Sequence, residues 1–476
     1  MIIPTEQAGA TAEKVEAVSD VSTEGAMHGY YRALLDSVTR NAGVGGPTIA
    51  EVLLRVMTAA PADLPRTDII RGSSLSAGTV SKATGALVRA GLITEGAARA
   101  ERPGRPILPL RLGSDRWAAV GVHVHHLAGR PVAVSGVLTS LANETLAGLA
   151  TRPLPPDDGP VVDVLVREIV NLIDDLAGTY LAAPAADGAA RRVLGLGVEL
   201  GAHVRDGRVV QYTNASWSRA GWHDVDLGPQ LSDKTGLAVV IDNDINTLAV
   251  RELYRNRITA DHFAVVAVLS EAVGGAIVVD RQVYRGGGGM AGEIGHLTVD
   301  YPQRTEPAPR RPTRRRLGFA DPCPCGEYGH VDSFAPPLRI SGELHGQDFD
   351  QAARAAARDS AGKLTPAGRA FQTAGRALGR GLAGLVNTVN PSHLLLILPP
   401  PLATAHPDSA AAEYRDAAEE EVDRAFSTGA TDARASQRTL TVEPLADDQI
   451  HLLGAQAAAV RVVDQLLADL RQVGRG

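Results

Sequence analysis

Residues able to do chemistry gather in three short stretches of the chain's second half. Asn243 and Asp244 follow an apolar segment, and a glycine-rich stretch at residues 286–296 ends in Glu-Ile-Gly-His. Carboxylates and an amide held on rigid turns can pair with several hydroxyl groups of one ligand. The only two cysteines form one motif, Cys323-Pro-Cys325, which in a cytosolic protein is typical of a metal site. The alternatives are a strand-ending turn at Asn243-Asp244 and a reduced thiol pair that binds nothing.

A different chemistry is indicated between residues 48 and 111. Nine basic and five acidic residues give this segment a net charge of +4, whereas the whole chain carries −7. A helix capped by Ser76 would expose a face of small, hydrogen-bonding or basic residues, and such a face can approach base edges in the major groove of DNA. That face is expected to carry Ala77, Gly78, Thr79, Ser81, Lys82 and Thr84.

The helix is followed by an expected two-stranded wing with an Arg-Pro-Gly-Arg turn. We expect residues 79–81 to face bases and Lys82 to bind phosphate, with wing arginines on phosphate or in the minor groove. The candidate DNA-contacting residues are Ser76, Thr79, Ser81, Lys82, Arg102 and Arg105. A local basic excess on an acidic protein is typical of a nucleic-acid module. The alternative is an ordinary three-helix subdomain with a basic hairpin.

Composition and length bound the class of protein. The chain has 476 residues and a mass of 49.7 kDa, which suggests about three domains. With 44% hydrophobic and 21% charged residues, it is not a wholly disordered chain. We expect no membrane span and no secretory signal, because no run of about 20 apolar residues occurs and the first residues lack a basic and then an apolar region. Together with two cysteines too few for a disulfide scaffold, this predicts a cytoplasmic protein.

From residue 117 onward, short apolar runs alternate with amphipathic helical patterns. Such alternation predicts an α/β body. Strands are expected at residues 118–124, 132–138, 193–198, 237–241, 263–269, 275–280 and 394–398, and helices at residues 161–176, 245–257 and 368–389.

Five passages together resemble the ROK family, which joins sugar kinases and sugar-responsive repressors. They are Arg-Pro-Gly-Arg-Pro at 102–106, Asp-Asn-Asp-Ile-Asn at 242–246, the glycine-rich stretch at 286–296, Cys-Pro-Cys-Gly-Glu-Tyr-Gly-His at 323–330, and Asn-Thr-Val-Asn-Pro at 387–391. The pair Ala-Gly-Glu-x-Gly-His and Cys-x-Cys-Gly-x-x-Gly is the most specific. The likeness extends from about residue 48 to near the end of the chain.

The resemblance implies a two-lobed α/β body of the actin-like, sugar kinase type, preceded by a winged helix-turn-helix. The expected division is a flexible tail at 1–46 with one weak helix around residues 27–38, the DNA-binding domain at 47–115, an N-terminal lobe at 116–246 and a C-terminal lobe at 247–454. A C-terminal helix at 455–474 is expected to return to the N-terminal lobe.

The resemblance also implies ligand sites. The residues expected to bind sugar hydroxyls are Asn243, Asp244, Glu293, His296 and Asp332. Family members of this type bind zinc through the same histidine and three cysteines, and His330 stands where the third cysteine would be. The expected ligands are therefore His296, Cys323, Cys325 and His330.

The stretches that bind nucleotide in family kinases differ here. His123 stands in place of the expected aspartate, while His125 and His126 stand in place of glycines that let the backbone approach phosphate. Glu271 lies in a second phosphate loop, and three prolines at 399–401 replace a glycine pair. We interpret the histidines as filler where a functional loop was lost.

These departures favour a regulator over an enzyme. The expected function is a sugar-responsive transcriptional repressor with operator DNA, a sugar effector and a second copy of itself as partners, in a homodimer or homotetramer. Sugar would shift the lobes or subunits so that the winged helices no longer match operator half-sites. The alternatives are an active sugar kinase with a fused DNA-binding domain, and a regulator that has lost its ligand.

Overall fold

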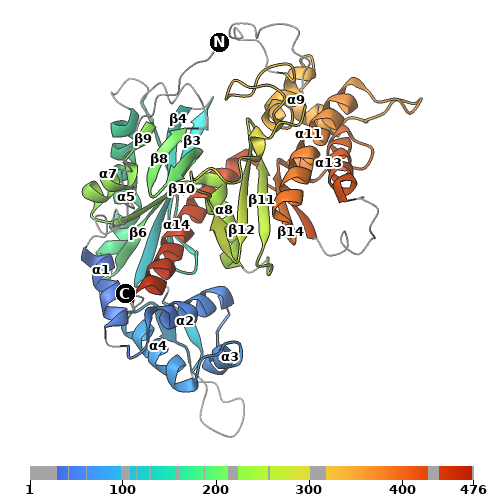
Figure 1. Cartoon of the computed structure of the whole chain (residues 1–476). Coiled ribbons are helices and arrows are strands. Elements are labelled where there is room, and N and C mark those ends of the chain that lie inside the picture. Colours follow the sequence, from blue (N-terminus) through green and yellow to red (C-terminus); the bar gives the residue numbers. More distant parts are fainter. Residues whose placement is uncertain are drawn as a thin grey trace, which may run out of the picture.

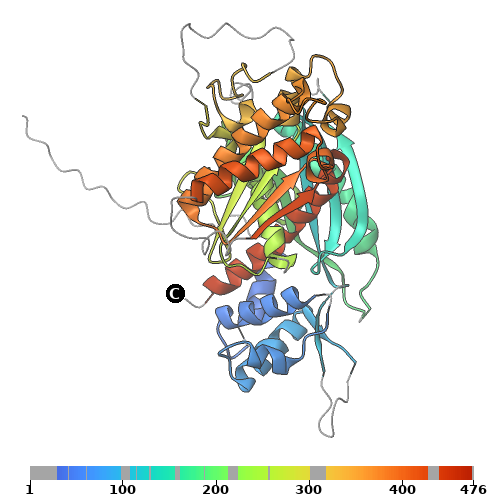
Figure 2. The ribbon, with the colours of Figure 1, turned by 90° about the vertical axis from the view of Figure 1, so that its right-hand side faces the viewer.

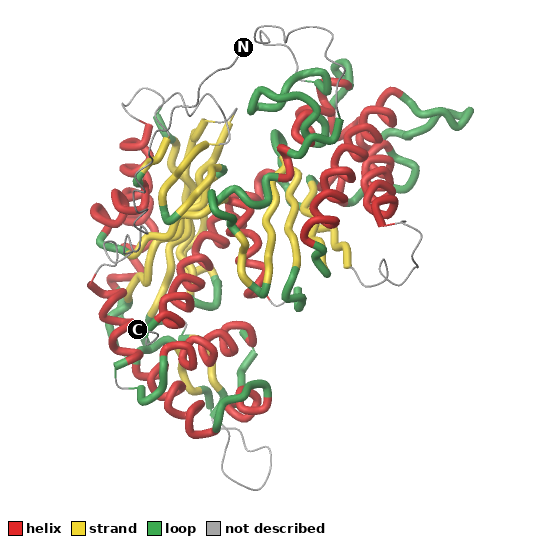
Figure 3. Tube along the Cα trace, in the orientation of Figure 1, coloured by secondary structure: helices red, strands yellow, loops and turns green. Residues whose placement is uncertain are grey.

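The structure is a computed structural model that describes residues 29–40, 42–60, 62–97, 108–113, 115–127, 130–155, 161–186, 188–212, 223–255, 258–300, 318–426 and 439–473. Two lobes stand side by side, and a smaller helical module lies below one of them (Figure 1). Each lobe has a sheet flanked by helices (Figure 3). No helix among the described residues is long and apolar enough to cross a membrane.

The small module contains four helices and a two-stranded antiparallel hairpin. Its elements are α1(Gly29–Thr39), α2(Gly46–Ala59), α3(Arg66–Arg71), α4(Ala77–Arg89), β1(Ile93–Glu95) and β2(Leu110–Leu112). Ser76 caps α4 as predicted, since its Oγ accepts from the Thr79 backbone N–H at 3.1 Å. Leu64 bridges to Leu110 and so adds to the hairpin edge. This helical module is consistent with a DNA-binding domain.

Two expectations for this module need correction. The segment 1–46 was expected to be a tail with one weak helix around residues 27–38. That helix is α1, but it is no part of a free tail, because Tyr31, Leu34, Leu35 and Val38 are buried in the hydrophobic core. Their spacing places them on one face of a helix, so burial of that face holds α1 against the module. Thr84 was expected on the exposed face of α4, but it is 0% exposed and faces the core.

The first lobe is built on a five-stranded sheet of order β10-β6-β3-β4-β5. The strands are β3(Trp117–Leu127), β4(Arg130–Ser140), β5(Thr145–Pro153), β6(Arg192–Leu200) and β10(Ala238–Asn243). β3, β4 and β5 are antiparallel neighbours, whereas β6 and β10 run parallel to β3. The helix α5(Val161–Ala182) packs on one face. A small sheet beside it contains β7(Ala202–Arg205), β8(Arg208–Tyr212) and β9(His223–Val225), which α7(Leu227–Thr235) follows.

The second lobe repeats this pattern in the order β13-β12-β11-β14-β15. Its strands are β11(Phe263–Val268), β12(Val273–Val279), β13(Gln282–Tyr284), β14(His393–Leu398) and β15(Thr439–Pro444). Side chains of β11 alternate between two cores, as the two-residue period of a strand requires. Phe263, Val265 and Ala267 pack with α8(Asp244–Arg255), whereas Ala264 and Val266 pack with α11(Pro366–Val389) and α13(Ala410–Phe426). Shorter helices complete this lobe: α9(Pro337–Glu343), α10(Phe349–Arg354), α12(Pro400–Ala403), η2(Ile294–His296) and η3(Val331–Ser333).

The last helix, α14(Asp447–Gln472), connects the parts of the molecule. It crosses the first sheet diagonally and ends beside the small module (Figures 1 and 2). Glycines permit its close approach, because a Cβ at Gly121 or Gly197 would lie 1.9 Å from a carbonyl oxygen of α14. Near its C-terminus, Leu466, Leu467 and Leu470 belong to the same core cluster as α2 and α4. The helix begins earlier than the expected residue 455.

Candidate functional site

The Asn243-Asp244 pair lies at the junction between strand β10 and helix α8. Asn243 Oδ1 accepts hydrogen bonds from the backbone N–H groups of Ile245 at 2.9 Å and Asn246 at 3.2 Å. Its Nδ2 donates to the Ala202 carbonyl at 3.3 Å. Asn243 therefore caps α8 and ties the junction to β7. Both the turn interpretation and the site interpretation of the sequence are compatible with this geometry.

Asp244 is the first residue of α8 and lies among other acidic groups. Burial and the nearby Glu199 carboxylate raise the pKa of Asp244 to about 7, and Glu293 contributes in the same direction. Glu199 is 1% exposed and accepts from Thr247 Oγ1 at 2.9 Å. The carboxyl group of Asp244 therefore changes charge near neutral pH. Groups perturbed in this way gather at functional sites.

Glu293 reaches this region from the second lobe. The glycine-rich stretch turns sharply before it, with φ +94° at Gly292, where a Cβ would lie 2.3 Å from the Gly275 carbonyl oxygen. Glu293 Oε1 lies 2.9 Å from His203 Nε2 on β7 and its Oε2 lies 3.9 Å from His296 Nε2. The glutamate thus connects the lobes. His203 was missed at the level of the sequence, and its one signal is a single imidazole in a short strand.

The predicted metal ligands are close together in space. His296, Cys323, Cys325 and His330 each offer a ligand atom within 4.8 Å of those of the other three. Cys323 Sγ lies 3.5 Å from His296 Nδ1, and Cys325 Sγ lies 3.4 Å from His330 Nδ1. Two thiols and two imidazoles are a donor set that fits tetrahedral Zn²⁺. The residues that are present therefore fit the expected ion.

Asp332 lies behind the site and is 5% exposed. Its Oδ1 accepts from the Val273 backbone N–H at 2.7 Å, and Gly295 leaves room for it, because a Cβ there would lie 2.5 Å from that oxygen. Burial raises the pKa of Asp332 to about 7. The structure therefore bonds Asp332 to strand β12 and places its carboxylate against Gly295, two residues after Glu293.

A buried ion-pair network was not predicted from the sequence. Asp242 is 2% exposed and accepts from Arg461 Nε of α14 at 2.8 Å. Arg285, which precedes the glycine-rich stretch, pairs with the same carboxylate. Although burial alone would raise it, the guanidinium groups of Arg461 and Arg285 hold the pKa of Asp242 below its usual value. Asp242 therefore joins strand β10, helix α14 and the second lobe directly beside Asn243.

Strand β3 ends among polar groups. His123 Nδ1 is bonded to Glu199 Oε1, and His125 Nε2 lies 2.6 Å from Ser135 Oγ. Burial, His123 and His451 lower the pKa of His125 to about 3, so this ring is neutral at physiological pH. The histidines therefore have specific partners, which the filler interpretation does not explain.

On the small module, the exposed face of α4 carries most of the predicted DNA contacts. Ser76, Ser81 and Lys82 are exposed and Thr79 is half-buried. Arg102 and Arg105 lie outside the described residues. The module thus presents short polar side chains and one lysine on a single helix face.

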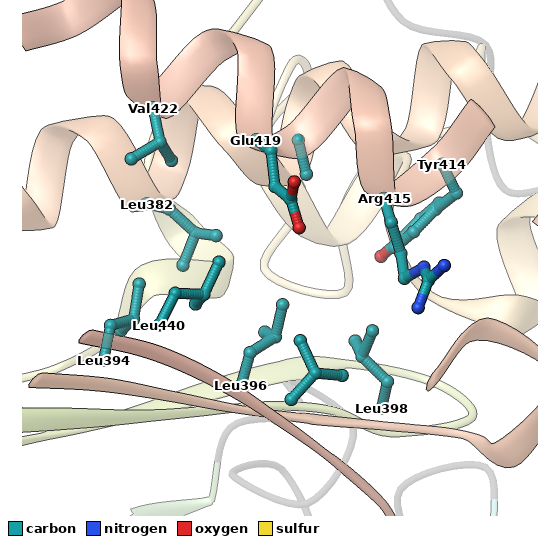
Figure 4. A pocket seen from close by; sticks show the side chains of 11 residues that line it. Leu382, Leu394, Leu396, Leu398, Tyr414, Arg415, Glu419, Val422 and Leu440 are labelled. Carbon is teal, nitrogen blue, oxygen red and sulfur yellow. The ribbon is translucent and has the colours of Figure 1, made fainter. Parts of the chain in front are cut away.

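An apolar pocket occurs in the second lobe, between α13 and strands β14 and β15 (Figure 4). Its walls are mostly aliphatic side chains, five of them leucines, and Arg415 and Glu419 of α13 also line it (Figure 4). None of the predicted sugar, metal or DNA residues lines it. It belongs to the packing of α13 on the sheet and not to the polar site.

Residues 165–397 match the sequence model of the ROK family. Through this domain the chain belongs to the ROK family, and its body has the α/β sugar kinase type of fold. This confirms the family and fold class expected from the sequence.

Similar proteins include both kinases and regulators. A glucokinase of Halalkalibacterium halodurans is 34% identical over 121 residues, which cover 25% of this chain and 32% of that protein. A xylose repressor of Caldicellulosiruptor bescii is 23% identical over 70% of this chain and 78% of that protein. The chain thus matches about a third of the length of the glucokinase and 78% of the length of the repressor.

Among solved structures, a ROK family transcriptional regulator, a homolog of the E. coli MLC protein, is similar with a TM-score of 0.61. The similarity covers 90% of this chain and 98% of that one at 20% identity, so it bears on the fold. Because only about a tenth of this chain is left out, the similarity covers at least part of the small N-terminal module as well as the body.

Proposed function

We propose that this chain is a sugar-responsive transcriptional regulator of the repressor type. One observation carries the proposal: the small N-terminal module, which we take to be a DNA-binding winged helix-turn-helix, shares a hydrophobic core with α14, and α14 crosses the body beside the polar site. A DNA-binding element and a ligand-binding body are thereby packed together. The similarity to a protein described as a xylose repressor supports the same function.

In this proposal a sugar binds between the lobes at the β10–α8 junction. Asp244 and Glu293 accept hydrogen bonds from hydroxyl groups, and His296 contributes from η2. Asn243 keeps the junction rigid through its capping bonds and uses its remaining capacity on the sugar. Asp332 positions the turn through the Val273 N–H. His203, whose buried Nδ1 has no hydrogen-bond partner among the described residues, is an additional donor to the ligand.

We further propose that the chain does not transfer phosphate. Phosphoryl transfer needs groups that neutralise phosphate charge and hold a metal ion beside it. At the end of β3 the imidazole of His123 is bonded to the buried Glu199, and Glu271 adds a carboxylate in the β11–β12 turn. The competing function is an active sugar kinase with a fused DNA-binding module. Incubation with ATP and the sugar that binds separates the two, because only the kinase forms a sugar phosphate.

Zinc is proposed as a structural ion held by His296, Cys323, Cys325 and His330. The ion would tie η2, which follows Glu293, to the 323–330 segment and so hold the sugar-binding turn in place. Burial raises the pKa of the Cys323 thiol and so disfavours its thiolate form. A bound ion would stabilise that thiolate. The chain is proposed to act in the cytoplasm.

The regulatory step is proposed to be a population shift. Sugar favours one arrangement of the lobes, and α14 transmits that preference to the module because it packs against both. Two modules of a homodimer or homotetramer then match or miss operator half-sites. A gel-shift assay with DNA selected by the full chain tests this: a sugar should change the affinity of the wild type and leave Asp244→Ala unaffected.

A further inference from the structure

A group of three histidines lies at the contact between strand β3 and helix α14. His123 and His125 are two residues apart on β3 and point to the same side, as the strand period requires. His451 in the first turns of α14 comes from the other end of the chain and stacks on His125 with 3.6 Å between ring centroids. A ring nitrogen of each histidine lies within 4.8 Å of a nitrogen of the other two.

The two strand histidines are held by groups behind them. The carboxylate of Glu199 is bonded to His123 Nδ1 and is itself fixed by Thr247. Ser135 Oγ lies 2.6 Å from His125 Nε2 and 2.5 Å from Thr151 Oγ1. Partners of this kind fix the ring orientation and leave the second nitrogen of each ring for a metal ion. A carboxylate behind a histidine also increases the basicity of the ligand nitrogen.

Helix α14 is shaped to cover this group. Gly454 lies one turn after His451, and a Cβ at this position would lie 2.0 Å from Glu199 Oε1 and 2.8 Å from His123 Nδ1. Any side chain here would push the helix away from the pair. The glycine therefore allows α14 to lie directly on the His123–Glu199 pair with His451 beside it.

We propose that His123, His125 and His451 form a binding site for a divalent transition-metal ion of the Zn²⁺ or Ni²⁺ class. Imidazole nitrogens suit these ions, and three of them leave a fourth position for water or a small ligand. Binding requires the stacked rings of His125 and His451 to rotate apart, because ligands of one tetrahedral ion cannot lie face to face. The site contains no thiol and is separate from the Cys323–Cys325 cluster.

A metal ion at this position would cross-link α14 to the sheet of the first lobe. Because the other end of α14 packs in the core of the small module, the ion would stabilise the docked form of the helix that both parts share. The proposal does not depend on sugar binding or on DNA binding. It concerns residues that the sequence suggested were filler.

The test uses the full chain, freed of metal by a chelator, in which both Cys323 and Cys325 are replaced by Ser so that the thiolate cluster cannot bind. Zn²⁺ is titrated in competition with a chromophoric chelator. We expect the chain to bind one Zn²⁺ ion. His451→Gln should lower the affinity for Zn²⁺ at least tenfold, whereas His406→Gln, a control at an exposed histidine, should leave the affinity unchanged. Co²⁺ should give visible d–d absorption without a thiolate charge-transfer band.

A second variant on the strand side, His125→Gln, protects the test against a folding defect in α14. Circular dichroism without metal checks that each variant folds. Zn²⁺ should raise the unfolding midpoint of the cysteine-free parent and of its His406→Gln variant, but not that of His451→Gln or His125→Gln. The proposal is overturned if the cysteine-free chain binds no Zn²⁺. It is equally overturned if folded His451→Gln and His125→Gln both bind Zn²⁺ as the control does.

Discussion

Replacing Arg461 by Met tests whether helix α14 is tied energetically to the candidate site. Arg461 is 8% exposed and its Nε lies 2.8 Å from Asp242 Oδ2, while its Nη1 lies 2.6 Å from Asp464 Oδ2. Methionine fills similar apolar volume, so the change removes charge and hydrogen bonds and leaves the packing of the stem. It leaves Asp242 buried with fewer partners.

The size of the effect follows from what remains around Asp242. Removing one partner of a buried ion pair costs about 3–5 kcal/mol when the other charge is left alone. Here Arg285 and the Asn243 backbone N–H, at 2.9 Å, still bond to the carboxylate. We therefore expect a loss of about 2–3 kcal/mol, which lowers the unfolding midpoint of a lobe of this size by about 4–12 °C.

The assay is thermal and urea unfolding of the full chain, with Arg424→Met as the matched control. Arg424 lies on α13 with 63% of its side chain exposed and 3.0 Å from Glu421, so its loss should cost less than about 1 kcal/mol. Arg461→Met should also weaken the effect of sugar on DNA binding, whereas Arg424→Met should not. Equal, small losses in both variants would refute the argument that the Asp242 network holds α14 in place.

Three further outcomes are expected. Arg105→Ala should weaken binding to all DNA sequences and reduce the salt slope of log affinity by about one, and unchanged binding of an operator fragment would remove the wing from the interface. Cys325→Ser should lose the ion held by the cysteine–histidine cluster, so that the zinc content measured by elemental analysis falls by about one ion per chain. A wild-type chain that folds normally without metal would contradict the proposed zinc site. Because the folded pKa of Asp244 is about 7 against an ordinary 3.8, the stability it contributes is present below about pH 4 and is lost as pH rises through 7. The unfolding free energy of Asp244→Asn relative to wild type should therefore increase from about pH 4 to pH 8, and a flat difference would show that Asp244 titrates normally.

Local features of the fold could be predicted from the sequence. Ser76 caps α4, and Asn243 and Asp244 stand at a strand end, because capping and turn chemistry depend on neighbours in the chain. A weak helix was expected around residues 27–38, where α1 lies, but its burial was not expected, although Tyr31, Leu34, Leu35 and Val38 have helical spacing. The small polar residues around them obscured a short apolar stripe whose burial depends on distant parts of the fold.

Long-range features could not be predicted in the same way. The partners of the strand histidines are Glu199 on another strand and His451 on the last helix, and nothing near residues 123–126 indicates either. The Asp242–Arg461 pair likewise depends on where α14 packs. The cysteine cluster was predicted because family motifs specify its ligands. The structure brings them within 4.8 Å, and the ion itself stays a prediction.

The most direct test of the central claim is one titration. The full chain is used to select its preferred DNA from a random pool, and binding of that fragment is followed by fluorescence anisotropy while xylose, glucose or another monosaccharide is added. If a sugar bound at Asp244 controls DNA binding, at least one sugar should change the dissociation constant tenfold or more, which is about 1.4 kcal/mol. Asp244→Ala should abolish this change and still bind the DNA. Failure of the chain to select any DNA sequence, or the same DNA affinity with every sugar, would refute a sugar-responsive regulator.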